Sequence, residues 1–115
     1  MTTLTLYGIP NCGSCKKARA WLDERGLTYR FHDFRKDGLD ADWLAALIAR
    51  LGFEVLINRR GTTWRQLDAS QQADWTPAKA HALILQYPTL IKRPLLAHGN
   101  EVLIGFTPES YTHLS

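Results

Sequence analysis

The chain has 115 residues, of which 45% are hydrophobic, so it can bury the core of one compact domain spanning residues 1–115. A formal net charge of +3 is smaller than expected for a dedicated nucleic-acid-binding protein and suits a small anionic partner at least as well. No stretch approaches the roughly 20 apolar residues of a membrane helix, and Met1–Leu4 does not begin a signal peptide, so we expect a cytoplasmic protein.

A strand, a helix and a second strand are predicted at the start of the chain. Leu4–Tyr7 is a short apolar strand pattern. Apolar residues then recur at helical spacing from about Cys12 to Arg25, and Gly26 is placed to end this helix. In Leu27–Phe34, aromatic and polar residues alternate, which indicates a strand. Such a βαβ unit makes its two strands parallel, with a right-handed crossover.

Cys12 and Cys15 stand at the start of the first predicted helix and form a redox-type pair, which fits a reducing compartment. A thiol must lose its proton to act as a nucleophile. The positive end of a helix favours the anion, and Lys16 and Lys17 add positive charge one turn on. Side chains three residues apart on a helix, about 5–6 Å between Cβ atoms, can form a disulfide. We therefore interpret Cys12 as the attacking thiol and Cys15 as a candidate resolving thiol.

Two other interpretations of the cysteine pair stay open at this point. The pair could be half of a four-thiolate zinc site, but the chain has no other cysteine and no paired histidines at ligand spacing, so we predict no metal ligands. Alternatively, both cysteines could pack in the core as small apolar groups. Reactivity of Cys12 toward a thiol-alkylating reagent in the folded protein separates this structural role from a catalytic one.

A helical block is predicted in the middle of the chain. Asp40 is a suitable N-cap for a helix that ends at Gly52. The run Phe53–Ile57 is ambiguous, because it is too short for a clear helix and has enough β-branched residues for a strand. After a turn, Thr62 or Thr63 can cap a short helix.

The C-terminal part is predicted to hold one more helix of this block, a β-hairpin and a last short helix. Thr76–Pro77 indicates a helix start, with the threonine as cap and the proline in the first turn. Two strand-like runs, Leu95–Ala97 and Glu101–Ile104, flank a turn at His98–Asn100 and form the hairpin. Thr107–Pro108 begins the last helix.

Several segments carry patterns beyond this outline, namely Tyr7–Cys12, Phe31–Leu39, Asn58–Trp64, Ile91–Leu95 and Leu103–Phe106. Together they resemble the ArsC/Spx family, and within it the YffB-type branch of ArsC-related reductases, over nearly the whole chain. The resemblance implies an α/β, thioredoxin-like fold: a four-stranded mixed sheet with a helical insertion between strands two and three. It also implies a cis peptide bond at Pro94, facing the cysteine, and favours a helix for Glu54–Ile57.

The resemblance also implies roles for individual residues. Cys12 matches the nucleophilic cysteine of ArsC proteins, in which three arginines steady an oxyanion. Arg93, and Arg60 or its neighbour Arg59, match two of these arginines, whereas Gly105–Glu109 has no arginine where the third is expected. This departure weighs against arsenate reduction, because a hydrogen bond to a charged group is worth roughly 1.5–3 kcal/mol.

Further candidate contacts surround the thiol pair. Asn11 is predicted first as a helix cap and second as a substrate contact. Lys16 is a candidate anion contact, and Pro94 is expected to present backbone groups to an extended peptide such as glutathione. We expect Arg93 to draw an anionic substrate toward Cys12 and to favour its thiolate.

These assignments lead to one main function and two alternatives. The main prediction is an ArsC-related thiol reductase that uses glutathione as cosubstrate and holds no bound cofactor. The first alternative is an Spx-like redox-sensing regulator that binds the C-terminal domain of the RNA polymerase α subunit. The second alternative is an arsenate reductase.

Overall fold

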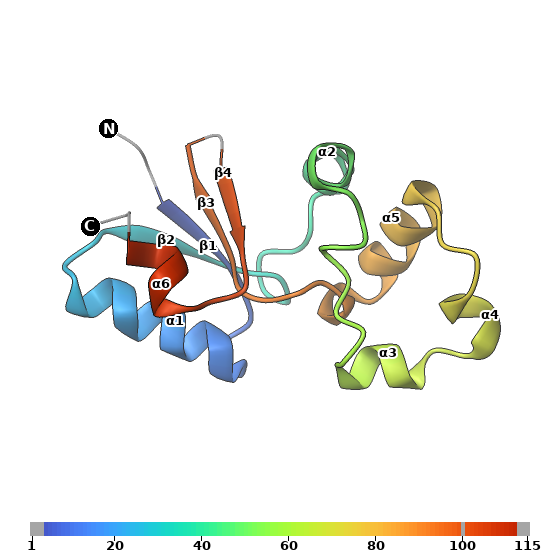
Figure 1. Ribbon diagram of the computed structural model, residues 1–115, viewed down its shortest axis with the longest axis horizontal. Coiled ribbons are helices and arrows are strands. Elements are labelled where there is room, and N and C mark those ends of the chain that lie inside the picture. Colours follow the sequence, from blue (N-terminus) through green and yellow to red (C-terminus); the bar gives the residue numbers. More distant parts are fainter. Residues whose placement is uncertain (1–3, 100, 113–115) are drawn as a thin grey trace. The chain divides into compact units, whose positions relative to one another are not determined.

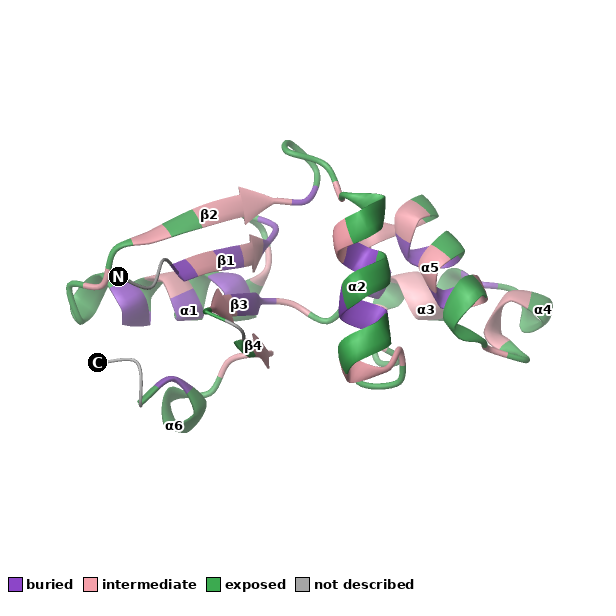
Figure 2. Cartoon of the chain, turned by 90° about the horizontal axis from the view of Figure 1, so that it is seen from above, coloured by how far each residue is buried: buried purple, intermediate pink, exposed green. Residues whose placement is uncertain are grey.

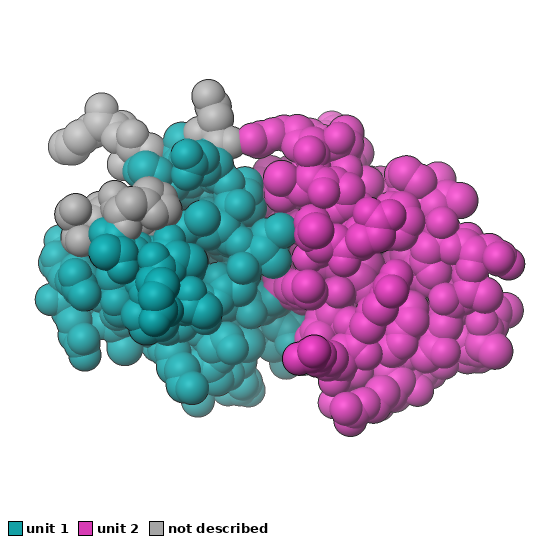
Figure 3. Space-filling model, in the orientation of Figure 1, with its two compact units in different colours: residues 1–38, 93–115 teal, residues 39–92 magenta. Residues whose placement is uncertain are grey.

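The protein consists of two compact units in a computed structural model that describes residues 4–99 and 101–112 (Figure 1). The first unit contains the described residues up to Gly38 and those from Arg93 onward, and the second is Leu39–Lys92 (Figure 3). The second unit is therefore one continuous insertion into the first. That the whole chain behaves as a single domain stays a prediction.

A four-stranded mixed sheet forms the centre of the first unit. It contains, in spatial order, β2 (Tyr29–Asp33), β1 (Leu4–Gly8), β3 (Leu95–His98) and β4 (Glu101–Ile104). β1 and β2 are parallel, whereas the β1–β3 and β3–β4 pairs are antiparallel. These pairings confirm the predicted βαβ unit, mixed sheet and hairpin. Asn100, in the predicted hairpin turn, lies outside the described residues.

Helix α1 (Gly13–Glu24) packs on the sheet because its apolar residues recur at helical spacing (Figures 1 and 2). One buried cluster joins it to the sheet and to α6 (Pro108–Tyr111), and contains Leu4, Leu6, Ala18, Trp21, Leu22, Leu96 and Tyr111. Gly26, with a φ of 68°, follows the end of α1 in a left-handed conformation. The predicted helix end is therefore confirmed.

The second unit is helical and contains α2 (Ala41–Leu51), α3 (Thr62–Gln66), α4 (Ala69–Gln72), α5 (Pro77–Gln86) and the 3-10 helix η1 (Pro88–Leu90). Asp40 caps α2 by accepting a hydrogen bond from the Trp43 backbone N–H at 2.7 Å. Thr76 caps α5 by accepting one from the Lys79 backbone N–H at 3.1 Å. Both helix starts agree with the sequence prediction. No helix within the described residues has the length and apolarity to span a bilayer.

The helix that the family resemblance favours for Glu54–Ile57 is wrong. The segment is a turn that leads into an isolated antiparallel bridge between Ile57 and Ile91. Backbone hydrogen bonds join residues 56–58 to residues 90–92 on both sides of this bridge. The Leu56 and Ile57 N–H groups close the turn by donating to the Phe53 carbonyl, but the end of the turn pairs with a segment distant in the sequence, and a local pattern could not reveal that pairing.

Two other details of the helical block differ from the prediction. The N-cap of α3 is Gly61, and the predicted caps Thr62 and Thr63 lie inside the helix. Helix α4 was not predicted, although a capping box between Asp68 and Gln71 closes its start. Both helices are short, so their apolar spacing gives little signal.

Candidate active site

The break between β1 and α1 places Cys12 at the start of the helix. Cys12 is the N-cap residue of α1, with φ −89° and ψ 124°, and its backbone N–H donates to the Ile9 carbonyl at 3.3 Å. The predicted cap at Asn11 is wrong, because Asn11 is an exposed turn residue that precedes the cap. The Cys12 residue therefore adjoins the unpaired N–H groups of the first helical turn. A substrate contact by Asn11 stays a prediction.

The two cysteines are free thiols in different environments. Cys12 is partly exposed, whereas Cys15 is fully buried, at 0% exposure. The backbone N–H and the thiol of Cys15 both donate hydrogen bonds to the Cys12 sulfur. The interpretation that both cysteines pack in the core as apolar groups therefore holds for Cys15 alone. Cys12 is the thiol that a reactant can reach.

Arg93, in the segment before β3, donates a hydrogen bond from its side chain to the Cys12 sulfur. The Arg93–Pro94 peptide bond is cis, which confirms the expectation from the family resemblance. Pro94 is fully buried, and its carbonyl accepts a hydrogen bond from the Gly105 backbone N–H at 2.8 Å. The structure thus brings Arg93 to the predicted nucleophile, as proposed from its place before the proline.

Electrostatics favour the thiolate of Cys12. Burial acts to raise the pKa of this thiol, but the hydrogen bonds from Cys15 and Arg93 and the Arg93 charge outweigh burial, so the pKa lies below its ordinary value. From the sequence, the helix start, Lys16, Lys17 and Arg93 are all expected to favour this thiolate. Both lysines are exposed on α1. The contacts that lower the pKa come from Arg93 and from Cys15, whose backbone N–H belongs to the first turn of α1.

The net effect of the environment on the pKa of Cys15 is the opposite. Burial raises the pKa of the Cys15 thiol to about 12, and the hydrogen bond and charge of Cys12 add to this effect. A hydrogen bond from the Ile9 backbone N–H and the charge of Arg93 oppose it without reversing it. The pair therefore combines an outer thiol whose pKa is lowered with an inner thiol that stays protonated at neutral pH and donates to it.

Two residues close to Cys15 were not identified from the sequence. A Cβ placed on Gly8 would lie 2.5 Å from the Cys15 sulfur, so the glycine leaves room for that atom. Tyr111 of α6 is fully buried, and its hydroxyl has no hydrogen-bond partner among the described residues. Burial and the charge of Cys15 hold the pKa of Tyr111 above its usual range. The only sequence signal for a role of Gly8 is its place in the break after the predicted first strand. No sequence signal indicates a role for Tyr111.

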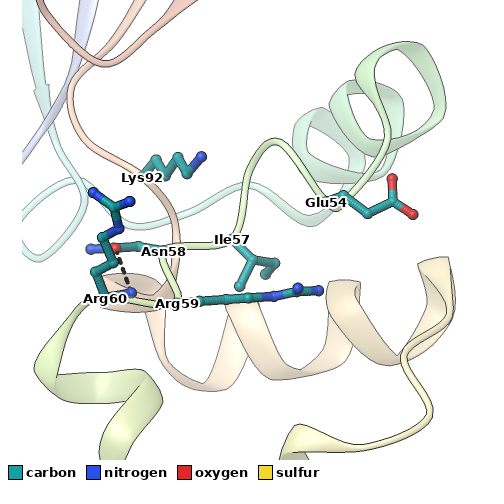
Figure 4. A pocket seen from close by; sticks show the side chains of 6 residues that line it. All are labelled: Glu54, Ile57, Asn58, Arg59, Arg60 and Lys92. Atoms are coloured by element: carbon teal, nitrogen blue, oxygen red, sulfur yellow. Dashed lines mark hydrogen bonds between the residues drawn. The ribbon is translucent and has the colours of Figure 1, made fainter.

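Arg59 and Arg60 lie in the second unit and were predicted as anion contacts. They line a pocket of about 420 Å³ whose other lining residues are Glu54, Ile57, Asn58 and Lys92 (Figure 4). The Asn58 side chain accepts a hydrogen bond from the Arg60 backbone N–H at 3.1 Å and so fixes the turn. The side chains of Arg59 and Arg60 point in different directions, and the Arg59 guanidinium lies 5.6 Å from the centre of the Trp64 ring.

The pocket of the second unit carries an excess of positive charge. The lining contains three cations, Arg59, Arg60 and Lys92, and one carboxylate, Glu54, and none of the three cations forms an ion pair within the described part of the chain. Such a pocket fits an anion. Lys92 was not singled out from the sequence, although it lies in one of the segments that carry the family resemblance. The roles of Arg59 and Arg60 toward Cys12 stay predictions.

The fold and the thiol pair together define the class of protein. The mixed sheet, the cysteine pair at the start of the first helix and the cis proline before β3 make this a thioredoxin-like α/β protein with a thiol site. Within residues 4–99 and 101–112, no group of three or more His, Cys, Asp or Glu side chains could hold a metal ion. The ArsC family model matches residues 7–114, and the chain therefore belongs to the ArsC family.

Relatives of known structure or function place the chain among ArsC-related proteins. The structure of a YffB protein is similar with a TM-score of 0.92 and 46% identity, covering 96% of this chain and 97% of that one. An arsenate reductase (ArsC) related protein from Brucella melitensis is similar with a TM-score of 0.80 and 40% identity, covering 96% and 92%. The global transcriptional regulator Spx of Streptococcus mutans is 29% identical over 108 residues, covering 92% of this chain and 78% of the relative.

Proposed function

We propose that the protein is a glutathione-dependent thiol reductase in which Cys12 is the nucleophile. The observation that carries this proposal is that Cys12 is partly exposed and that the pKa of its thiol is lowered by hydrogen bonds from the buried Cys15 and from Arg93. The thiolate is the reacting form, so a thiol with a lowered pKa is the better nucleophile near neutral pH. Membership in the ArsC family and likeness to an arsenate reductase related protein support reduction as the kind of chemistry.

The proposed reaction begins with a mixed disulfide between glutathione and a substrate thiol. The Cys12 thiolate attacks the glutathione sulfur, a disulfide between Cys12 and glutathione forms, and the substrate leaves as a thiolate that takes up a proton. The thiolate of a second glutathione then attacks the glutathione sulfur of this intermediate. Glutathione disulfide leaves and the Cys12 thiolate is restored, so one disulfide is reduced and one is formed.

Cys15 offers a second way to resolve the intermediate. Its thiolate would attack the Cys12 sulfur, release glutathione and form a Cys12–Cys15 disulfide, which two further glutathione molecules would reduce. This route requires Cys15 to lose its proton, and a pKa of about 12 keeps it protonated near neutral pH. We therefore propose direct attack by glutathione as the main route, with Cys15 as donor to Cys12.

Positively charged residues are proposed to hold the carboxylates of glutathione. Arg93 contacts the Cys12 sulfur and is the proposed contact for the portion of the tripeptide beside the disulfide. Arg60 and Arg59 line the cationic pocket together with Lys92, which supports a role in anion binding. Lys16, exposed on α1, is a further proposed contact.

Comparison of Cys12→Ser with Cys15→Ser tests the proposed mechanism. Turnover of a glutathione mixed disulfide by the purified protein is measured with glutathione as reductant. We expect Cys12→Ser to fall to the uncatalysed rate, because a hydroxyl is not ionised near neutral pH. We expect Cys15→Ser to keep turnover at a rate reduced by less than about tenfold, because direct attack by glutathione needs only Cys12.

The outcomes of this comparison are distinct. Full turnover by Cys12→Ser contradicts the mechanism. Loss of turnover in Cys15→Ser would show that Cys15, and not glutathione, attacks the Cys12 sulfur of the intermediate. Turnover by the unmodified protein with dithiothreitol but not with glutathione keeps Cys12 as nucleophile and removes glutathione as cosubstrate.

A redox-controlled regulator that binds the RNA polymerase α subunit is the second candidate function. The observation that favours it is the identity to the regulator Spx, which extends over most of both chains. A cysteine pair that can be oxidised would serve such a regulator as well as a reductase. Lack of turnover by an unmodified protein in which Cys12 still reacts with an alkylating reagent favours the regulator over the reductase.

A further inference from the structure

We propose that Gly8 is a positioning residue of the thiol site: it leaves the space that holds the Cys15 sulfur beside the Cys12 sulfur. The inference rests on the proposed function only in taking Cys12 as the reacting thiol. Gly8 is the last residue of β1, and Cys15 lies in the first turn of α1, so the contact joins the strand to the helix start.

The need for glycine at this position is one of space and not of backbone conformation. A Cβ on Gly8 would lie 2.5 Å from the Cys15 sulfur and 3.5 Å from the Cys15 Cβ. The first distance is far inside van der Waals contact, whereas the second is ordinary. Gly8 is not among the glycines with positive φ, and its backbone pairs with β2 as part of the sheet. A larger residue could adopt this conformation, but only if the Cys15 sulfur moved.

The position of the Cys15 sulfur is defined on several sides. Gly8 bounds it where a side chain would otherwise project, and the Ile9 backbone N–H donates a hydrogen bond to it. On a further side, the Cys15 thiol donates to the Cys12 sulfur. Because the Gly8 carbonyl accepts from the Phe34 backbone N–H at 2.9 Å, the strand end is fixed in the sheet and cannot easily give way. A methyl group on Gly8 would therefore displace the sulfur and weaken the hydrogen bond to Cys12.

Gly8→Ala tests the inference through the reactivity of Cys12. We expect the pH profile of Cys12 alkylation by iodoacetamide to move to higher pH. The rate at pH 6 should fall by roughly three- to tenfold, because the thiolate loses one hydrogen-bond donor. Peptide mass spectrometry assigns the label to Cys12. Gly13→Ala is the matched control, because a Cβ there would meet no described atom within 4 Å, and its profile should match that of the unmodified protein.

A double-mutant cycle separates positioning from general distortion. Cys15→Ala removes the displaced sulfur, so adding Gly8→Ala to Cys15→Ala should leave the alkylation profile unchanged. The inference is overturned if Gly8→Ala alone has the profile of the unmodified protein. It is equally overturned if Gly8→Ala shifts the profile by the same factor with and without the Cys15 sulfur.

Thermal unfolding decides the case if Gly8→Ala proves too unstable for alkylation. With the sulfur removed, the Cβ of residue 15 would lie 3.5 Å from the new Cβ, an ordinary contact. Adding Cys15→Ala to Gly8→Ala should therefore bring the Tm back to that of Cys15→Ala alone, and failure to do so overturns the inference. Because neither readout uses glutathione or a disulfide substrate, a negative result here is distinct from failure of the proposed reductase activity.

Discussion

Arg93 acts on the Cys12 sulfur both by donating a hydrogen bond and by its positive charge. An arginine keeps its charge throughout the pH range in which thiols titrate, so its influence does not fade as the pH changes. Cys15 contributes hydrogen bonds but no positive charge. Reactivity of Cys12 below neutral pH should therefore depend on Arg93.

Replacing this residue in Arg93→Gln should raise the pKa of Cys12, because a nearby positive charge favours the charged thiolate and its removal disfavours it. At a pH below the pKa, a higher pKa means less thiolate. The rate of Cys12 alkylation at pH 6 should therefore fall by roughly tenfold, whereas the rates of the two proteins should converge at high pH. The measurement is the second-order rate with iodoacetamide as a function of pH.

Lys17→Gln is the control for charge alone, because Lys17 is exposed on α1. Its alkylation profile should match that of the unmodified protein. A shift in Lys17→Gln as large as that in Arg93→Gln would contradict the assignment to Arg93 and support the explanation based on the lysines of α1.

The sequence could identify the proposed reacting thiols and Arg93, but not the other groups that set the pKa of Cys12. The spacing of Cys12 and Cys15 is visible in the chain, and the place of Arg93 before Pro94 is part of the family pattern. The contact between Gly8 and Cys15 depends on how closely β1 and α1 approach, which residue types alone do not specify. Whether Lys16 or Lys17 lies close enough to contact the thiol is likewise a matter of packing.

Helix α2 shows how a single side chain specifies the start of an element. Asp40 accepts a hydrogen bond from the Trp43 backbone N–H, one of the donors left unpaired in a first helical turn. Asp40→Ala should lower the free energy of unfolding by about 1 kcal/mol, as measured by urea denaturation. Asp40→Asn keeps a side-chain acceptor and should stay close to the unmodified protein. Equal losses in both variants would show that the charge matters and the cap does not.

At the scale of elements, the sequence predicted the helices and strands that are specified by a local residue pattern. The four strands, α1, α2 and α5 follow from apolar spacing, caps and glycine stops, and the structure confirms them. The turn at Glu54–Ile57 differs because its last residues bridge to residues 90–92, far along the chain. Helix α4 has no buried residue, so it offers no apolar pattern to detect.

At the scale of the whole molecule, the net charge is only +3, but positive charges are concentrated in one place. Arg59, Arg60 and Lys92 line one pocket of the second unit with a single carboxylate. Like charges held together destabilise the fold unless an anion compensates them. An anion that binds there should therefore stabilise the folded protein.

The double variant Arg60→Gln/Lys92→Gln tests this charge concentration with sulfate as the probe. Millimolar sulfate should raise the Tm of the unmodified protein more than sodium chloride does at equal ionic strength. A ligand at 100 times its Kd adds about 2.7 kcal/mol to the free energy of unfolding. The double variant should lose most of this gain, and Arg65→Gln, an exposed residue of α3 that does not line the pocket, should keep it. Equal gains in all three proteins would remove the pocket as an anion site.

The insertion also has a consequence for the order in which the protein is made. Cys12 precedes Leu39–Lys92, and Arg93 follows it directly. The ribosome therefore synthesises Cys12 long before Arg93, whose hydrogen bond and charge lower the pKa of the Cys12 thiol in the folded protein. A nascent or prematurely terminated copy that ends before Arg93 carries Cys12 without this contribution, so its thiol should ionise less readily than in the finished protein.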